Sequence, residues 1–351
     1  ASHSIRATFQ RGTEIPDFGP VVGEVYISIE NNTYWGGDFT GTLASGWYDL
    51  CAEDTMMTIV LKALALDGYS WWGTGASDTG GYDITYLSGI YMDKNGNGRR
   101  DNSEPSLAEF DGSRGAGWMG TLNDWFVNEG FQSFRVGGRG TYELADGDYL
   151  NIVFTQNLGE DVGSLWGNSD TSLEDLHISG GSLAPRFDGD TLEYTLSITG
   201  NSARVTVTPT AVNKNYMVKT FLNRYNRDSA FYKRTESITV KPGDILYIGV
   251  GDPSWPSMNN QSTEAIDYEG TKYTITVVNG NSAEAVIGMI KAVPEITYAN
   301  YKTQASKVSA ARAAYDALTQ KAKAEISQTL LNKLEAAEEK IEFYEKIDPA
   351  K

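Results

Sequence analysis

The sequence predicts a mainly β protein with some helix (α+β): a small α+β domain, then a β-sandwich, then a C-terminal helical bundle. Up to about residue 282, short runs of alternating apolar and polar residues are separated by glycine-rich turns, as in strands. Of the 37 glycines, 36 lie at or before Gly280, and only Gly288 follows. Beyond that point Ala, Lys, Glu and Leu dominate, a composition typical of helices.

Two short stretches of small polar residues, 163–172 and 279–282, separate the predicted domains. A length of 351 residues suits two or three domains, each with a hydrophobic core of its own. We therefore expect domains over residues 4–165, 170–279 and 283–348.

In the first domain, strands are predicted over residues 5–9 and 25–29, and residues 142–155 predict a hairpin turn that leads into a strand. Residues 55–64 predict a short helix, with Asp54 as its N-cap and Gly68 as its C-terminal stop. A second short helix is predicted over 121–128, ended by Gly130. The mixture of strands and short helices makes this domain α+β.

The second domain shows a clearer strand pattern, over residues 192–198, 204–209, 237–240, 245–250 and 273–278. Short strands at this spacing suit a β-sandwich. In the third domain, helices are predicted over 283–292 and 301–323, and a third helix after Ser327. Apolar residues at three- and four-residue steps give the third helix one apolar face, which predicts a small antiparallel bundle.

The charge balance limits the classes of partner. The chain carries 46 acidic and 29 basic residues, a formal net charge of −17. This disfavours nucleic acid and anionic membranes, which bind through Lys and Arg. No apolar run reaches the roughly 18–20 residues of a membrane span, so we expect no membrane insertion. The single cysteine, Cys51, excludes a disulfide framework and a thiolate zinc site.

Two segment resemblances concern the β-rich part. The stretches TMMTIVLKALALDGY, GWMGTLNDWFVNEGF and LADGDYLNIVFTQNLGEDVGSLWGN resemble the small α+β domain that ends transcobalamin and intrinsic factor and is widespread in secreted clostridial proteins. LEDLHISGGSLAPRFDGDTLEYTLSI, with YTITVV closing the domain, resembles the bacterial cadherin-like β-sandwich.

The helical tail resembles spacer modules of Gram-positive surface proteins, through VSAARAAYDALTQKAKAEI. Together the three resemblances imply a secreted protein associated with the cell wall at the cell surface. In layout and aromatic content the chain is similar to the two-lobed scaffold modules of bacterial starch-adherence assemblies.

The segment DKNGNGRRDNSE, residues 93–104, fits the twelve-residue calcium loop. Gly98 stands where the loop needs a sharp turn, and Arg100 replaces the apolar residue that pairs EF-hands, which favours an isolated loop. The alternative is a surface turn without metal. The predicted structural calcium ligands are Asp93, Asn95, Asn97, Arg99 through its carbonyl, Asp101 and Glu104.

The chain holds 8 Trp, 20 Tyr and 12 Phe. Neighbouring residues of a strand point to opposite faces, so tandem tryptophans cannot both be buried on one face. Exposed rings beside Asp, Asn and Gln suit sugar binding. We therefore predict ligand-binding platforms at Trp35, Trp71, Trp72 and Trp255, and core positions for Trp47, Trp118 and Trp125.

No hydrolase, zinc-protease, Walker or dinucleotide motif is present, and we predict that the chain is not an enzyme; a carboxylate-pair glycosidase stays open. The favoured function is carbohydrate binding at a Gram-positive cell surface, with starch (α-glucan) as the polysaccharide and other cell-surface scaffold proteins as further partners. The alternatives are a host-protein adhesin of the immunoglobulin-binding type and a cobalamin-like small-molecule binder.

Overall fold

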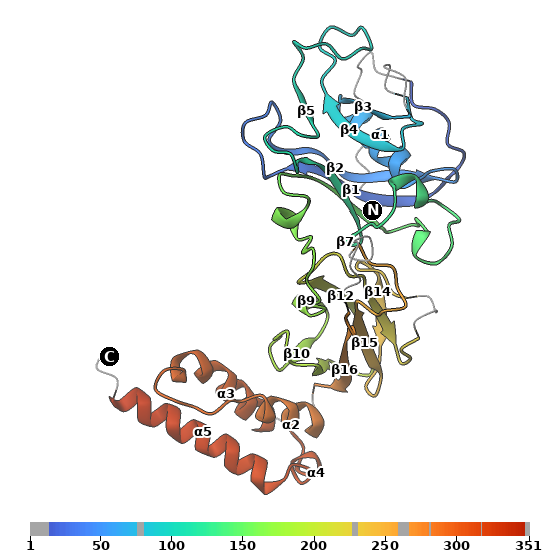
Figure 1. Ribbon diagram of the computed structural model, residues 1–351. Coiled ribbons are helices and arrows are strands. Elements are labelled where there is room, and N and C mark those ends of the chain that lie inside the picture. Colours follow the sequence, from blue (N-terminus) through green and yellow to red (C-terminus); the bar gives the residue numbers. More distant parts are fainter. Residues whose placement is uncertain are drawn as a thin grey trace.

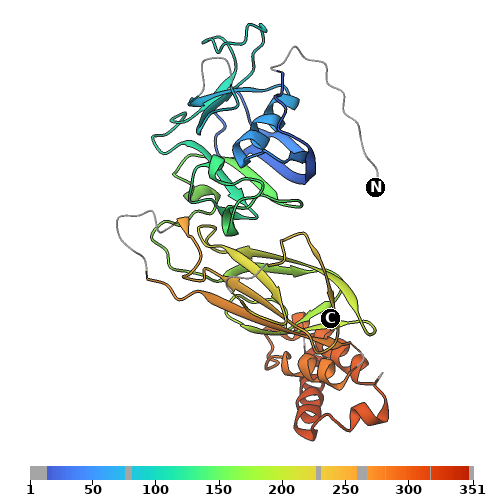
Figure 2. The same cartoon turned by 90° about the vertical axis from the view of Figure 1, so that its right-hand side faces the viewer.

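A computed structural model describes residues 14–75, 81–226, 231–258, 267–280, 282–316 and 318–347. The molecule is elongated, with an N-terminal lobe, a central β-sandwich and a helical part in succession (Figures 1 and 2). The predicted mainly β class with a C-terminal helical part is confirmed. The expected strand over residues 5–9 lies outside the described residues, and the predicted domain limits stay predictions.

The N-terminal lobe contains one large and one small sheet. The large sheet has the strand order β2-β1-β8-β6-β7, and β1 pairs parallel to β8. Its strands are β1 (Val21–Asn31), β2 (Gly41–Cys51), β6 (Gly117–Leu122), β7 (Trp125–Phe126) and β8 (Tyr149–Thr155). The small sheet consists of β3 (Ser70–Thr74), β4 (Tyr86–Tyr91) and β5 (Ser106–Ala108). Short 3-10 helices occupy Phe131–Ser133, Gly140–Tyr142 and Glu160–Val162.

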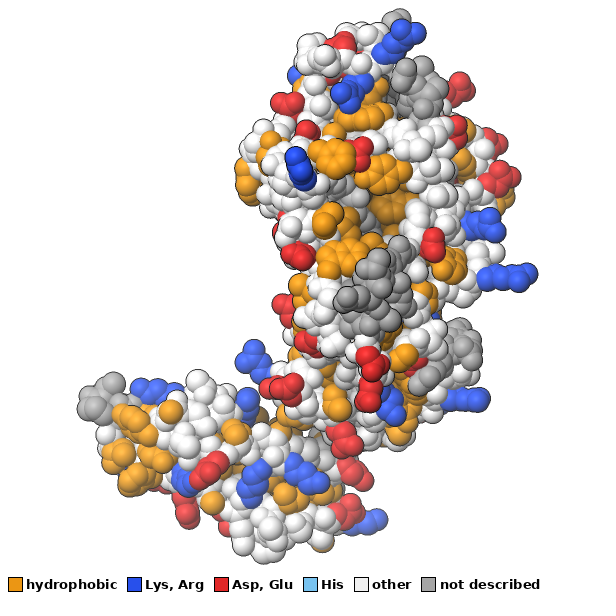
Figure 3. Space-filling view, viewed as in Figure 1, with side chains coloured by type: hydrophobic (Ala, Val, Ile, Leu, Met, Phe, Trp, Pro, Cys, Tyr) orange, Lys and Arg blue, Asp and Glu red, His pale blue; other side chains and the backbone are white. Residues whose placement is uncertain are grey.

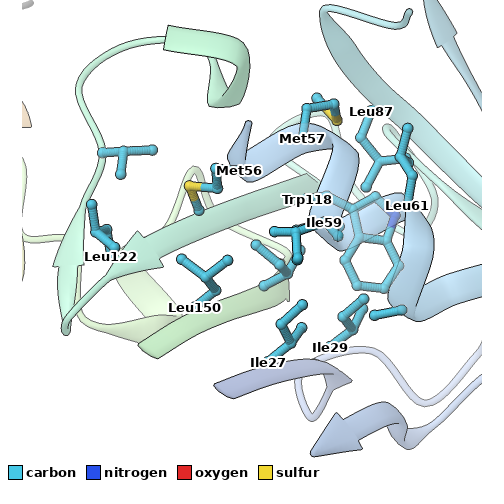
Figure 4. Packing of buried hydrophobic residues seen from close by; sticks show 14 of the residues in the cluster. Ile27, Ile29, Met56, Met57, Ile59, Leu61, Leu87, Trp118, Leu122 and Leu150 are labelled. Atoms are coloured by element: carbon cyan, nitrogen blue, oxygen red, sulfur yellow. The ribbon is translucent and has the colours of Figure 1, made fainter. Parts of the chain in front are cut away.

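Helix α1 (Met56–Leu66) covers one face of the large sheet. Alternate residues of β1, among them Ile27 and Ile29, are fully buried toward it. Figure 4 shows the Trp118 indole in this layer together with Ile29 of β1 and side chains of α1. Because α1 covers only one face, the side chains that alternate with Ile27 and Ile29 point to the opposite face of the sheet.

Helix α1 begins one residue later than predicted. Thr55 is the N-cap: its hydroxyl accepts the Thr58 N–H at 3.1 Å, and the Thr58 hydroxyl accepts the Thr55 N–H. Asp54, the predicted cap, is fully buried and forms a 2.5 Å ion pair with Lys62. Its carboxylate also accepts the Cys51 N–H at 2.7 Å, so this charge fixes the strand-to-helix corner.

The prediction of a helix over 121–128 was wrong. The segment forms a β-hairpin in which Leu122 of β6 pairs with Trp125 of β7. Asn123 and Asp124 make the two-residue turn with φ of 53° and 71°, the left-handed values that a type I′ turn requires. Both residue types tolerate this conformation, and the apolar spacing around them suited either structure.

The central domain is a sandwich of two sheets, with orders β10-β11-β16-β15-β13 and β14-β12-β9. Its core lies between them and includes Leu196, Val205 and Ile275, each without exposed surface. The predicted strands are confirmed with small shifts at their ends. The strands are β9 (Leu173–Ile178), β10 (Ser182–Ala184), β11 (Glu193–Ile198), β12 (Ala203–Ala211), β13 (Val218–Leu222), β14 (Ser237–Val240), β15 (Ile245–Val250) and β16 (Thr271–Asn279).

The N-terminal lobe and the sandwich share apolar packing at their junction. Met217, Phe221 and Trp255 of the sandwich belong to the same buried cluster as the core of the N-terminal lobe. The Trp125 indole N–H donates to the Asn215 carbonyl at 3.1 Å. Ion pairs Lys214–Asp124 at 2.9 Å and Lys233–Asp148 at 2.7 Å also cross the junction. These contacts hold the two domains as one unit.

The helical part consists of α2 (Ala283–Lys291), α3 (Tyr301–Asp316), α4 (Gln320–Lys323) and α5 (Gln328–Ile347). Helix α2 packs against β11 and β16 of the sandwich, and α3 packs against α5. The single helix predicted over 301–323 is divided into α3 and α4. Thr319 is the N-cap of α4, and its hydroxyl accepts the Ala322 N–H at 3.3 Å, so a new helix begins at Gln320. Arg312 of α3 joins Glu338 of α5 through two hydrogen bonds of 2.6 and 2.7 Å, and the Glu338 carboxylate raises the pKa of Arg312.

Candidate functional site

Two of the four predicted tryptophan platforms are buried. Trp71 is 1% exposed, lies against Tyr82, and donates its indole N–H to the Gly81 carbonyl at 3.0 Å. Trp255 is 5% exposed and packs on Phe221, with the Lys219 ammonium 4.5 Å from its ring centroid. The expectation that these two rings lie exposed was wrong, because Trp71 faces the lobe core and Trp255 closes the interdomain junction.

Trp72 and Trp35 occupy different surroundings. Trp72 points away from Trp71, as strand alternation requires, but the Arg100 guanidinium lies over its ring, 4.1 Å from the centroid. Its ring edge fills the space above Gly89, where an added Cβ would lie 2.2 Å from Trp72 Cη2. Trp35 is 73% exposed in the β1–β2 connection. Of the four predicted rings, Trp35 presents the freest surface.

Trp118 and Trp125 are core residues as predicted, whereas Trp47 is 48% exposed. Trp47 lies on the face of the large sheet that α1 does not cover. It pairs in register with Tyr26 of β1, which pairs in register with Tyr149 of β8. The three side chains therefore form one row across β2, β1 and β8, which we call the aromatic row.

The rings of the aromatic row contact one another. Tyr26 and Tyr149 stack with centroids 4.9 Å apart and planes at 21°. Trp47 meets both edge-on, at 5.6 Å from Tyr26 and 5.4 Å from Tyr149. Mutual contact restricts the ring rotamers, so the exposed part of Trp47 is held in place before any ligand arrives.

Polar groups flank the aromatic row on both sides. On one side, the exposed carboxylates of Glu24 and Asp49 face each other across β1 and β2. On the other, Ser28 is opposite Ser45 and also pairs with Asn151 of β8. The buried Asn151 Oδ1 has no hydrogen-bond partner among the described residues. The face thus offers aromatic rings in the middle, the carboxylates of Glu24 and Asp49 on one side and the exposed Ser45 hydroxyl on the other.

Sequence reasoning missed this row because Trp47 and Tyr48 are adjacent, and either could have faced the core. Tyr48 faces α1, where its hydroxyl donates to Asp67 at 2.7 Å. A register shift between Ile29 and Glu30 breaks the simple alternation of the β1–β2 pair. The available signal was Tyr26, which stands between the buried residues Val25 and Ile27 and therefore had to point outward.

The loop 93–104 is shaped by its own carboxylates. Asp93 accepts the Gly96 and Gly98 N–H groups at 2.7 Å each, and Glu104 accepts the Lys94 N–H at 2.9 Å. Gly96 and Gly98 have φ of 69° and 71°, which favours glycine. The Ser103 hydroxyl and N–H, as hydrogen-bond donors, lower the pKa of Asp101.

The donors in this loop are oxygens, the ligand type that calcium prefers. Within the described ranges, however, no three Asp, Glu, His or Cys side chains gather closely enough to hold a metal ion. The predicted ligands Asn95 and Asp101 are joined by a 2.7 Å hydrogen bond, and Asn97 accepts the Arg99 N–H at 2.7 Å. Calcium binding by this loop therefore stays a prediction.

The middle of the chain matches a known domain family. Residues 173–280 match the family model of the cadherin-like beta sandwich domain. The match covers the two-sheet domain described above and confirms that part of the predicted resemblance. A search of curated proteins found no match to the chain.

None of the helices in the described part of the chain has both the length and the apolar composition of a membrane span.

Proposed function

We propose that the chain is a non-catalytic carbohydrate-binding protein of a Gram-positive cell surface, and that the aromatic row of the N-terminal lobe binds a neutral polysaccharide, with α-glucan (starch) favoured. The observation that carries this proposal is the in-register row of Tyr26, Trp47 and Tyr149 with its half-exposed indole. The half-exposed indole of Trp47, set between polar flanks, has apolar area for a ligand to cover.

Sugar rings have apolar faces and a hydroxyl rim, and the aromatic row matches both. The Trp47 ring offers the stacking surface, while Glu24 and Asp49 on one side and Ser45 on the other accept or donate hydrogen bonds. Adjacent strands are about 4.8 Å apart, so the row spans roughly 10 Å and suits an extended ligand better than a single sugar.

The charges beside the row favour a neutral ligand. Glu24 and Asp49 are exposed, and the Asp146 carboxylate lies beside Glu24, accepting its N–H at 2.9 Å. Three carboxylates near the row repel anionic polymers such as uronic acid chains and nucleic acids. Hydroxyl groups of a neutral glycan donate to the same carboxylates without this repulsion.

Trp35 is the second candidate platform, since its exposed ring lies in the connection between the same two strands. Asn31, fully buried, fixes the connection by donating to the Tyr34 and Phe39 carbonyls at 2.6 and 2.7 Å. The turn is therefore held from within, and the Trp35 ring stays outside it. A long glycan that reaches both rings would bind more tightly than a short one.

Calcium is the proposed structural ion of the loop 93–104. Its place in the function is indirect, since Arg100 of this loop covers Trp72. Binding would draw the oxygen groups of Asp93, Asp101 and Glu104 together and so stabilise the loop against β3.

A glycan array that includes neutral and acidic polysaccharides tests the proposed function. We expect signal for α-glucans, with little for cellulose and none for uronic acid polymers. Trp47→Ala is expected to lose this signal, and Phe343→Ala, which removes a similarly exposed ring from α5, is expected to keep it. An array on which the chain retains no glycan would contradict the proposal.

One observation favours a second function, adhesion to a host protein of the immunoglobulin type. Tyr298, Phe343 and Ile347 of the helical part are 51%, 56% and 52% exposed. Hydrophobic side chains gather at the end of the helical part farthest from the sandwich (Figure 3). Apolar groups on a helix suit helix-face protein recognition, and an immunoglobulin column tests this alternative directly.

A further inference from the structure

A groove of about 470 Å³ runs beside β6 in the N-terminal lobe. Its size falls in the range of ligand pockets, roughly 300–1,000 Å³. Figure 3 shows hydrophobic side chains gathered over the N-terminal lobe. The exposed or half-buried large apolar side chains in its lining include Tyr86, Phe110, Met119, Phe131, Leu158 and Trp166. This mostly apolar lining differs from the aromatic row, whose flanks are polar.

Two of these residues combine strain with exposure. Phe110 has φ of 69° and is 67% exposed, and Leu158 has φ of 52° and is 62% exposed. A left-handed backbone costs a residue with a Cβ about 1–2 kcal/mol, and a large apolar side chain in water recovers little of that cost by packing. A ligand that covers both side chains would bury their exposed apolar surface and so offset the cost of the strained backbone.

The backbone edge of β6 is open at the same place. On the edge of β6 that faces away from β8, the Ala116 carbonyl is already hydrogen-bonded, because it accepts the Phe110 N–H at 2.9 Å. The Gly120 carbonyl on the same edge is also hydrogen-bonded, since it accepts the Val127 N–H at 3.2 Å. Strand alternation directs the Trp118 N–H and C=O to this edge, between these two carbonyls. Among the described residues, no third strand pairs with β6 there.

Acidic and basic side chains both line the groove. Glu109, Glu129 and Arg114 belong to its lining. The Tyr86 hydroxyl donates to Glu109 at 3.0 Å, and burial raises the pKa of Tyr86 to about 12, so this donor keeps its proton at neutral pH. Two carboxylates and one guanidinium favour a ligand with a basic group near its apolar part.

We propose that this groove binds an extended peptide segment of a partner protein, which pairs with the β6 edge at Trp118 and places a large apolar side chain against Phe110 and Leu158. Strand addition of this kind takes affinity from main-chain hydrogen bonds and specificity from a side-chain pocket. An apolar lining with few hydroxyl partners suits a Leu, Met or Phe side chain better than a sugar. A basic residue of the peptide lies near Glu109 or Glu129.

A random peptide library displayed on phage, panned against the full chain, supplies the probes. Enriched sequences are resynthesised and their Kd is measured by fluorescence anisotropy. We expect enrichment of peptides with one large apolar residue beside a basic one. Methylation of the peptide backbone nitrogen that faces Trp118, located by scanning each position, is expected to weaken binding about tenfold or more.

The groove variants are Phe110→Asn and Leu158→Asn. Asparagine tolerates the left-handed conformation, so both variants are expected to fold with unchanged melting temperatures while peptide affinity falls about tenfold. Phe343→Asn, at an exposed phenylalanine of α5, is the control and is expected to bind peptide normally. Starch binding is expected to stay unchanged in both groove variants.

Three results would overturn the proposal. They are a library from which no binding peptide is enriched, a peptide that tolerates methylation at every nitrogen, and equal peptide affinity for the native chain and Leu158→Asn. Loss of starch binding in the groove variants without any peptide binding would assign the groove to the glycan instead. Because peptide and starch are measured separately, failure of this proposal leaves the proposed glycan function standing.

Discussion

Removal of the Trp47 ring is the sharpest perturbation of the aromatic row. An aromatic side chain has about 150–250 Å² of surface, and Trp47 is 48% exposed, which leaves roughly 75–120 Å² for a ligand. At about 25 cal/mol per Å², covering this area contributes about 2–3 kcal/mol to binding. Trp47→Ala is therefore expected to raise the Kd for a long maltooligosaccharide about 20- to 150-fold.

Isothermal titration calorimetry measures this change, and thermal unfolding by circular dichroism checks the fold. The Ala variant also loses edge contacts with Tyr26 and Tyr149, at about 0.5–1.5 kcal/mol each, a loss that a lobe with this core tolerates. Trp47→Phe keeps a ring and is expected to bind with an intermediate Kd. A folded Trp47→Ala protein whose Kd stays within about twofold of the native value would show that the glycan does not stack on Trp47.

Three further predictions follow from the same structure. Glu104→Gln is expected to weaken calcium binding about tenfold or more, measured by calorimetry and by the fluorescence of Trp72 beneath Arg100; native protein that binds no calcium would contradict the loop assignment. Trp71→Ala is expected to lower the free energy of unfolding by about 3–5 kcal/mol in a denaturant titration, since the ring is 1% exposed, and a loss under about 1 kcal/mol would contradict its core role. A chain ending at residue 282 is expected to stay folded and bind starch as the full chain does, and lost binding would place the helices in the site.

The sandwich strands were predictable because one face of each strand is buried. In β12, Val205 and Val207 alternate with exposed or half-buried neighbours, and the period of two appears directly in the sequence. The helices were predictable from composition and capping. The division of α3 from α4 was not, because a single side chain, Thr319, decides where a new helix begins.

The candidate site was less predictable, because exposure of an aromatic ring depends on tertiary packing. Trp255 lies in a turn-rich segment that suggests a surface position, yet it is buried against the N-terminal lobe, at a contact distant in sequence. Trp47 was predicted to lie in the core but is 48% exposed, since its neighbour Tyr48 packs against the core instead. A hairpin turn at Asn123 likewise depends on β8, whose backbone at Tyr149 pairs with that asparagine.

Co-sedimentation with granular starch, together with retention on an immunoglobulin column, separates glycan binding by the aromatic row from protein binding by the helical part. Carbohydrate binding through the aromatic row predicts that the native chain pellets with starch, that Trp47→Ala stays in the supernatant, and that neither is retained by immunoglobulin. A native chain that stays in the supernatant with starch and is held by the immunoglobulin column would contradict carbohydrate binding and favour adhesion through the helical part.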